Sequence, residues 1–134
     1  KIILDYLNKL PDGNCICHGD IHFNNIIVSG RNMVAVDWNS AYRGNPLGDV
    51  ARTMLLVNSP VTRSTLPSIV RSPARIGKCL ICSTYVTEYM KLSGADYRSI
   101  DDWILPLAAA KLKDGVPGDE GWLMEIIDRR LKKM

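Results

Sequence analysis

The sequence has no long apolar run, no cluster of basic residues and no segment of low complexity. A membrane-spanning helix needs about 18 or more consecutive apolar residues, and no run approaches that length. The N-terminus lacks the basic and then apolar order of a secretory signal. The net charge of +3 is mixed in sign, without the Lys/Arg runs of a nucleic-acid or membrane surface. We therefore expect a cytoplasmic protein that binds no nucleic acid and no membrane.

An initiator methionine is also missing, since the chain starts at Lys1 in the middle of an amphipathic pattern. Its 134 residues, 46% hydrophobic and 23% charged, lie within the range of one globular domain with its own core. We expect residues 1–134 to form one compact unit that is a fragment of a longer protein.

Cysteine is scarce, with a C-x-C pair at Cys15 and Cys17 and a C-x-x-C pair at Cys79 and Cys82. Such pairs occur in zinc sites and in redox pairs. They also occur as reduced core residues, because free cysteine is often buried. We favour the core interpretation, since each pair flanks apolar residues, and we keep a zinc-stabilised helical module as a rival.

Hydrophobic spacing predicts an α+β chain that is mostly α-helical. Helical periodicity covers residues 2–10, 47–57, 73–92, 100–113 and 119–132. Short β-prone runs predict a strand at 14–17 and a hairpin formed by 26–28 and 33–36.

Turn and cap signals set the limits of these elements. Pro11-Asp12-Gly13 predicts a turn after the first helix, and the Ser/Thr/Pro/Arg-rich stretch before Pro73 predicts a surface connection. Ser99 and Asp102 are spaced like a capping box for the helix at 100–113, in which Pro106 predicts a kink.

The residues with the clearest chemistry lie in the polar loop before the hairpin and at the hairpin's exit. The loop carries Asp20 and Asn25, and Asp37 follows the second hairpin strand. A hairpin folds Asp37 back beside the loop. Phosphoryl transfer needs a carboxylate near the acceptor hydroxyl and oxygen ligands for Mg²⁺, and these three side chains can supply both.

The motif around these residues resembles the signature of the aminoglycoside phosphotransferase family. The matching positions are His18-Gly19-Asp20-x-His22-x-x-Asn25, Asp37-Trp38 and Gly44-x-Pro46-x-x-Asp49-x-Ala51. The resemblance implies the C-terminal lobe of a protein-kinase-like fold, with a small β-hairpin at the catalytic loop. Residues 14–38 would form the catalytic loop and hairpin, and residues 47–134 a helical subdomain.

The resemblance also implies a phosphotransferase that moves the γ-phosphate of ATP or GTP to a hydroxyl of a small molecule, with Mg²⁺. Asp20 matches the catalytic aspartate, which orients or accepts the proton of the acceptor hydroxyl. Asn25 and Asp37 match the Mg²⁺ ligands. Taken singly, each aspartate would be interpreted as a turn cap.

Four further positions receive roles from the same resemblance. His22 would lie near the transferred phosphate, or it would be a hydrogen-bonding loop residue. His18 and Asp49 would support the catalytic loop, Asp49 by accepting loop N–H groups. Ile27 and Val36 would form a floor beneath the adenine, although apolar strand residues are core by default.

A kinase of this kind needs a second lobe with a phosphate-covering glycine-rich loop and a strand lysine, and the sequence has neither. We expect the missing N-terminal lobe to belong to the same protein, and the fragment alone to be inactive. An apolar face left uncovered would lead the fragment to self-associate.

Two questions stay open at this point. A kinase-like, non-catalytic binding or regulatory module is the alternative function, although it predicts the loss of a metal ligand. The acceptor is undefined: Asn39 stands where the family often has an acidic residue, and an acidic acceptor surface would have to come from other residues. The candidates are Asp101, Asp102, Asp119 and Glu120.

Overall fold

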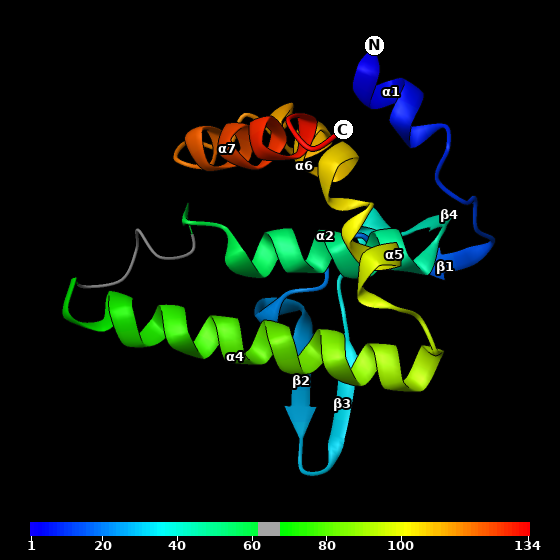
Figure 1. The fold of residues 1–134 in the computed structure, drawn as a ribbon. Helices are drawn as coiled ribbons and strands as arrows, with labels where there is room; N and C mark the ends of the chain where they lie inside the picture. The colour runs from blue at the N-terminus through cyan, green and yellow to red at the C-terminus, as the bar shows by residue number, and fades with distance from the viewer. Residues whose placement is uncertain (62–67) are drawn as a thin grey trace.

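A computed structural model describes residues 1–61 and 68–134, with the side chains of residues 68–75 left out. Its centre is the helix α2 (Pro46–Asn58), which lies between the long helix α4 (Ser68–Ser93) and the pair α6 (Ile104–Leu112) and α7 (Glu120–Leu131). Two small antiparallel sheets complete the fold (Figure 1). The α+β, mostly helical class predicted from the sequence is confirmed.

Helix α2 begins where its sequence contains two start signals. The side chain of Asn45, the N-cap residue, accepts a hydrogen bond from the backbone N–H of Leu47 at 2.9 Å. Pro46 follows at the first helical position, where its missing N–H costs nothing. These signals fix the start of α2 and therefore the position of every residue on it.

The core forms around α2, because its apolar residues point toward helices on both sides. It contains Val50, Ala51 and Leu55 from α2, Val86 from α4, Ile100 from α5 (Tyr97–Asp101), Ile104, Leu105 and Ala108 from α6, and Leu123 and Ile127 from α7. Burying a Leu, Ile or Val side chain stabilises a fold by about 1.5–3 kcal/mol. This apolar packing holds the helices around α2.

The two sheets differ in how well the sequence predicted them. The hairpin of β2 (Ile26–Ser29) and β3 (Asn32–Ala35) is confirmed, with Ile27 opposite Val34. The predicted strand at 14–17 appears as β1 (Cys15–Cys17), and it pairs with β4 (Tyr42–Gly44), which the sequence analysis missed. Three residues give too short a pattern to identify a strand, so only its pairing with β1 defines β4.

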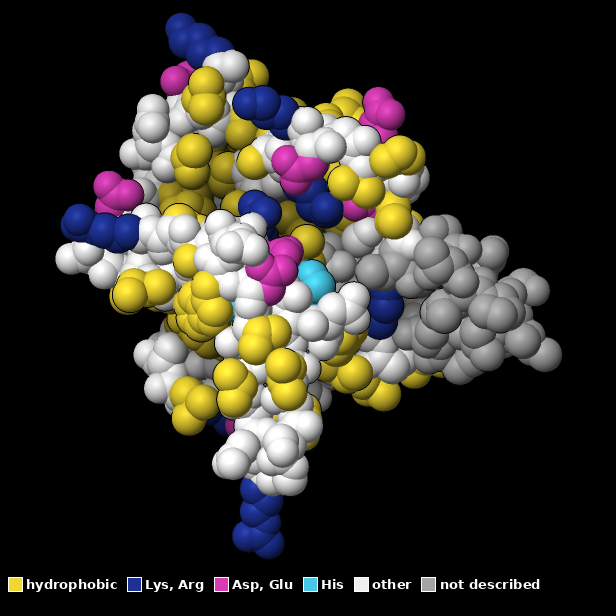
Figure 2. Space-filling view, turned by 180° about the vertical axis from the view of Figure 1, so that it is seen from behind, with side chains coloured by type: hydrophobic (Ala, Val, Ile, Leu, Met, Phe, Trp, Pro, Cys, Tyr) yellow, Lys and Arg dark blue, Asp and Glu magenta, His cyan; other side chains and the backbone are white. Residues whose placement is uncertain are grey.

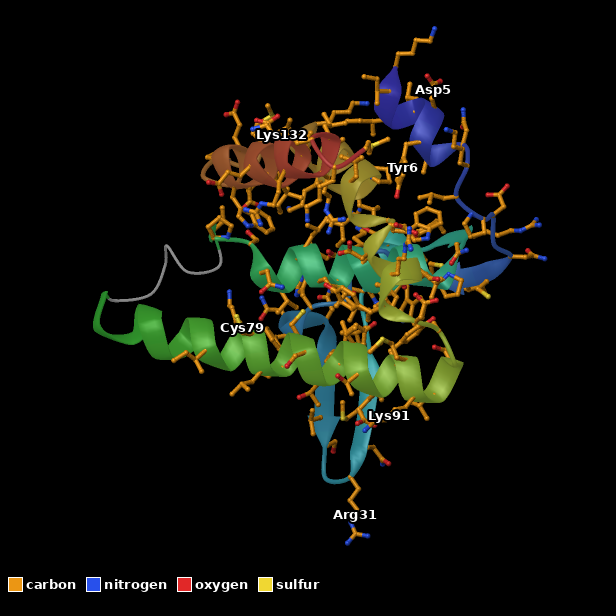
Figure 3. The ribbon with its side chains drawn as sticks, in the orientation of Figure 1. Asp5, Tyr6, Arg31, Cys79, Lys91 and Lys132 are labelled. Atoms are coloured by element: carbon orange, nitrogen blue, oxygen red, sulfur yellow. The ribbon has the colours of Figure 1, made fainter. Side chains whose placement is uncertain are left out.

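The N-terminal helix is shorter than predicted. Helix α1 spans Ile2–Leu7 instead of residues 2–10, because the last residues form turns before Pro11. Tyr6 points from α1 toward the body of the molecule, where its hydroxyl lies 3.3 Å from Oδ1 of Asp102 (Figure 3). This contact ties α1 to the end of α5.

The predicted helix at 100–113 is two helices, and its predicted cap is wrong. Asp96 caps α5, accepting the backbone N–H of Ser99 at 2.9 Å, so Ser99 is a helical residue and not the cap. Helix α6 begins at Ile104, which places Pro106 in its first turn, where proline needs no kink. The last helix, α7, is confirmed close to its predicted limits.

Helix α4 begins at Ser68, earlier than the start predicted near Pro73. The predicted surface connection includes residues 62–67, which lie outside the described residues. The start of α4 was missed because a Ser/Thr/Pro/Arg-rich segment lacks the apolar spacing by which a helix is identified in a sequence. No helix in the described ranges has both the length and the apolar character needed to cross a membrane.

The cysteine prediction is half correct. Cys17 and Cys82 are buried, while Cys15 and Cys79 are exposed, and all four are free thiols. Residues two apart in a strand, or three apart in a helix, share a face, so the difference within each pair comes from what packs around each position and not from the local pattern. Residues 1–61 and 68–134 contain no group of three His, Cys, Asp or Glu side chains able to hold a metal, which counts against the zinc-stabilised module.

A bidentate ion pair joins Arg130 of α7 to Asp101 of α5. The Arg130 guanidinium donates from Nη2 to Oδ1 of Asp101 at 2.5 Å and from Nη1 to Oδ2 at 2.8 Å. Nη1 also donates to the Asp101 carbonyl at 3.1 Å. The pairing raises the pKa of Arg130, chiefly through its hydrogen bond to Asp101. Paired geometry of this kind is stronger than a single surface contact.

We predict that Arg130→Met lowers the free energy of unfolding by about 1–3 kcal/mol, because it removes hydrogen bonds to a charged partner and keeps the aliphatic stem. Urea denaturation followed by circular dichroism measures the change. Arg129→Met is the matched control, since Arg129 is exposed on the same helix. Equal stability of the two variants would contradict the prediction.

Candidate active site

The loop at 18–25 is fixed by one carboxylate from α2. Asp49 accepts the backbone N–H of His18 through Oδ2 and that of Gly19 through Oδ1, both at 2.8 Å. Asp49 lies in the first turn of α2, where the positive end of the helix dipole favours a negative charge. Both carboxylate oxygens therefore hold the loop at the point where it leaves β1.

Gly19 occupies a position that no other residue fits. Its φ of 77° is in the left-handed region, and a Cβ there would collide with the carbonyl oxygen of Ser40. Glycine therefore lets the loop turn tightly against the segment that follows the hairpin.

His18 joins this loop to the end of the hairpin. Its ring is buried, with Nε2 3.0 Å from the Val36 carbonyl and Nδ1 accepting the backbone N–H of Asp20 at 3.3 Å. The ring also packs against Trp38, with centroids 4.5 Å apart. These contacts fit a ring with its proton on Nε2. His18 thus links the loop at 18–25 to the end of the hairpin through its side chain.

Asn25 lies beside Asp20 and is held there through its amide nitrogen. Nδ2 donates to the Asp20 carbonyl at 2.9 Å and is 3.3 Å from Oδ2 of Asp20. The backbone carbonyl of Asn25 accepts the N–H of Val36 at 2.9 Å. Because Nδ2 faces Asp20, Oδ1 is the amide atom left to meet a cation.

Asp37 follows Val36 directly, so the same backbone bond brings it near Asn25. It is the one described residue other than glycine with positive φ, at φ 62° and ψ 63°. Such a conformation is uncommon and is concentrated at functional sites. Its Oδ1 accepts a 2.7 Å hydrogen bond from Nδ2 of Asn39, so the residue that departs from the family pattern orients the Asp37 carboxylate.

His22 faces the Asp20 carboxylate. Its Nε2 lies 3.5 Å from Oδ2 of Asp20, while Nδ1 accepts the backbone N–H of Asn24 at 3.3 Å and caps the short 3₁₀ turn Phe23–Asn25. Both interpretations of His22 from the sequence thus find support in its contacts, since it is a loop hydrogen-bonding residue and also lies beside Asp20.

The two residues expected beneath the adenine are placed differently. Ile27 is 55% exposed on β2, so it is not a core residue in this structure, whereas Val36 is partly buried at the end of the hairpin. The hairpin projects beyond α4 (Figure 1), and Arg31 extends from its tip (Figure 3). Three further apolar side chains of the hairpin, Val28, Met33 and Val34, are also more than half exposed.

Packing behind the loop explains a residue that the motif contained but to which sequence reasoning gave no role. Trp38 donates from Nε1 to the Ala35 carbonyl at 3.0 Å and covers the His18 ring. Burial raises the pKa of the nearby Cys17 thiol, and the negative charge of Asp49 acts in the same direction.

Two of the four acids considered for an acceptor surface are paired within the fold. Asp119 is only 1% exposed, with Oδ1 accepting from the Ser59 hydroxyl at 2.6 Å and Oδ2 lying 3.3 Å from Nζ of Lys111. A buried charge of this kind needs a partner. Asp101, which is partly exposed, is paired with Arg130.

Viewed from behind, the surface above the hairpin tip shows hydrophobic side chains beside acidic side chains and a histidine (Figure 2). Asp20, Asn25 and His22 contact one another in the loop, and Asp37 follows Val36, whose backbone N–H donates to the Asn25 carbonyl, at the end of an exposed apolar hairpin. Carboxylate and amide oxygens beside an apolar surface suit a nucleotide. Its phosphates bind Mg²⁺, and the flat face of its base packs on apolar side chains.

Part of the chain is similar to known proteins. Residues 2–76, more than half of the chain, match the profile of the phosphotransferase enzyme family. An uncharacterized protein of Metamycoplasma hominis is 37% identical over 62 residues, which are 45% of this chain and 12% of that protein. The chain thus spans about an eighth of that relative. No solved structure matches it.

We predict that Asp49→Asn loosens the catalytic loop, because an amide has one acceptor oxygen in place of two and brings an N–H group against the N–H of His18 or Gly19. Hydrogen exchange of these two backbone amides should accelerate roughly 10-fold or more, as expected for the loss of about 1.4 kcal/mol. Asp114→Asn, at an exposed position, is the control. Unchanged exchange at both amides would refute this role for Asp49.

Proposed function

The chain belongs to the phosphotransferase enzyme family, and from this we propose that the whole protein transfers the γ-phosphate of ATP or GTP to a hydroxyl group of a small molecule. The observation that carries the proposal is the contact of Asp20 with Asn25, together with the backbone bond from Val36 to Asn25, which brings the chain at Asp37 alongside this loop. Phosphoryl transfer depends mostly on positioning and on electrostatic stabilisation, which these polar side chains provide.

Asp20 is the group proposed to meet the acceptor. Its carboxylate is about one-third exposed, and Asn25 and His22 flank it at 3.3 and 3.5 Å. A carboxylate held in this way orients an acceptor hydroxyl toward the phosphate and accepts its proton as transfer proceeds. His22, with Nδ1 occupied by Asn24, presents Nε2 toward the same space.

Asn25 and Asp37 are the proposed Mg²⁺ ligands, and their donor atoms fit that ion. Mg²⁺ in phosphotransferases is held by one or two protein oxygen ligands, with phosphate and water completing the shell. The Asn25 amide faces Asp20 with its nitrogen, and Asp37 has a carboxylate oriented by Asn39. When bound, Mg²⁺ would neutralise charge on the phosphates.

We further propose that this chain is the C-terminal lobe of a protein-kinase-like fold, with residues 14–38 as catalytic loop and hairpin and residues 47–134 as helical subdomain. The nucleotide would lie on Ile27 and Val36, against a second lobe of the same protein. The exposed apolar hairpin supports this, because soluble proteins rarely leave such surface uncovered. The 134-residue chain alone would then bind nucleotide weakly, turn over little and self-associate.

A non-catalytic, kinase-like module is less well supported. Loss of a metal ligand is the change expected in such a module, and both Asn25 and Asp37 are present beside Asp20. The acceptor stays open, since the acids considered for an acceptor surface include two that are paired within the fold.

The proposal predicts that Asp20→Asn in the full-length protein reduces kcat about 10²–10⁴-fold, because it removes the proton acceptor. Asp37→Asn should instead raise the Mg²⁺ concentration needed for half-maximal rate, since a neutral ligand binds the ion less well. Turnover of ATP and GTP is measured with a panel of hydroxylated acceptors at varied Mg²⁺. Asp5→Asn, on α1 (Figure 3), is the matched control.

Acceptor-stimulated turnover that both site variants impair and Asp5→Asn keeps would support the kinase proposal. Full activity of Asp20→Asn would refute the proposed role of that residue. Tight nucleotide binding without turnover on any acceptor would favour the non-catalytic module.

A further inference from the structure

A cavity of about 420 Å³ lies where the segment after α1 passes β4. Figure 1 shows this segment descending from α1 beside the β1–β4 pair. Residues that line the cavity include Asn8 and Asp12 of that segment, Tyr42 and Gly44 of β4, and Trp103 between α5 and α6. None of them belongs to the cluster around Asp20, so the cavity has no part in the function proposed above.

Two aromatic rings form walls of this cavity, and glycines make room for both. A Cβ at Gly44 would lie 2.6 Å from Cε2 of Tyr42, and a Cβ at Gly48 would lie 3.1 Å from Cε3 of Trp103. Any larger residue at Gly44 would displace the Tyr42 ring. Gly44, a position of the motif identified in the sequence, therefore leaves room for an aromatic wall of the cavity.

The Tyr42 ring is restricted by its neighbours. Tyr42 stands opposite Cys17 in the β1–β4 pair, and its ring packs against Gly44. Burial, as the main cause, and the negative charge of Asp49 raise the pKa of Tyr42 to about 12, so the phenol stays neutral at physiological pH. A neutral ring that is already restricted loses little side-chain entropy when it binds a ligand.

The charge of the cavity has one sign. Asp12 is the charged residue among the described residues that line it, and no lysine or arginine is among them. Asn45 is rigid, because Nδ2 donates to the Pro11 carbonyl at 2.9 Å and Oδ1 accepts from Leu47. Asn8 adds a polar residue to the lining.

These features favour an organic cation over an inorganic one. Mg²⁺ and Ca²⁺ need several oxygen ligands at fixed distances, and one carboxylate does not provide them. A bulky ammonium ion is weakly hydrated, and the faces of Trp and Tyr attract it. We propose that the cavity between α1 and β4 binds an organic ammonium ion between Tyr42 and Trp103, with Asp12 as its counter-charge.

The test compares choline with 3,3-dimethylbutan-1-ol, which has the same shape and hydroxyl but carbon in place of the charged nitrogen. Both are titrated into the 134-residue chain labelled with ¹⁵N, and the indole N–H signals of Trp38, Trp103 and Trp122 are followed. The Trp103 signal is identified from Trp38→Phe and Trp122→Phe, which leave the cavity intact. Choline should shift the Trp103 signal and bind roughly 10-fold more tightly than its neutral analogue.

Two variants test the cavity itself. Asp12→Asn, a surface change in a turn, and Tyr42→Leu should each weaken choline binding about 5–10-fold, as expected for the loss of one charge or one ring. Asp5→Asn and Tyr97→Leu are matched controls, since both positions are exposed and lie outside the lining. Asp12→Asn keeps the test valid even if Tyr42→Leu fails to fold.

Equal affinity for choline and its neutral analogue would overturn the proposal, as would a shift confined to Trp38 or Trp122. Unchanged binding in Asp12→Asn would overturn the role of the counter-charge. None of these readouts needs nucleotide or turnover, so failure here is distinct from failure of the proposed phosphoryl transfer.

Discussion

The candidate site depends on the bond between Asp49 and the loop that follows β1. One carboxylate at the N-terminus of α2 accepts the N–H groups of His18 and Gly19, and through them it sets the direction of Asp20. A carboxylate in a first helical turn is itself stabilised by the helix dipole. The same helix buries Val50, Ala51 and Leu55 in the core, so the packing that stabilises the domain also fixes the loop.

From this point the site extends by short links to the hairpin. His18 contacts the Val36 carbonyl, Asn25 bonds both Asp20 and the backbone of Val36, and Asp37 follows at once in a left-handed conformation. Backbone contacts and neighbouring side chains together orient these residues, since Asn25 and His22 flank the Asp20 carboxylate and Asn39 donates to Asp37. A polar site is rigid when other groups hold its members in this way.

The sequence predicted best those elements whose limits are set by apolar spacing and turn residues within the segment itself. The hairpin, α2 and α7 follow from apolar spacing and turn residues, and they formed close to their predicted limits. The cap at Ser99 was wrong because Asp96, also a good cap residue, lies three residues earlier, and spacing alone does not choose between them. Strand β4 was missed because three residues carry no period.

The sequence by itself determined the helical class, the order of the elements and the set of polar residues around Asp20. Periodicity and motif spacing depend only on residues that are close together in the chain. Tertiary structure decided which of those residues meet. It paired Asp49 with His18 and Gly19, buried Asp119 against Ser59 and Lys111, and left Ile27 exposed. Contacts between residues far apart in the chain depend on how helices pack around α2, and no local pattern contains that information.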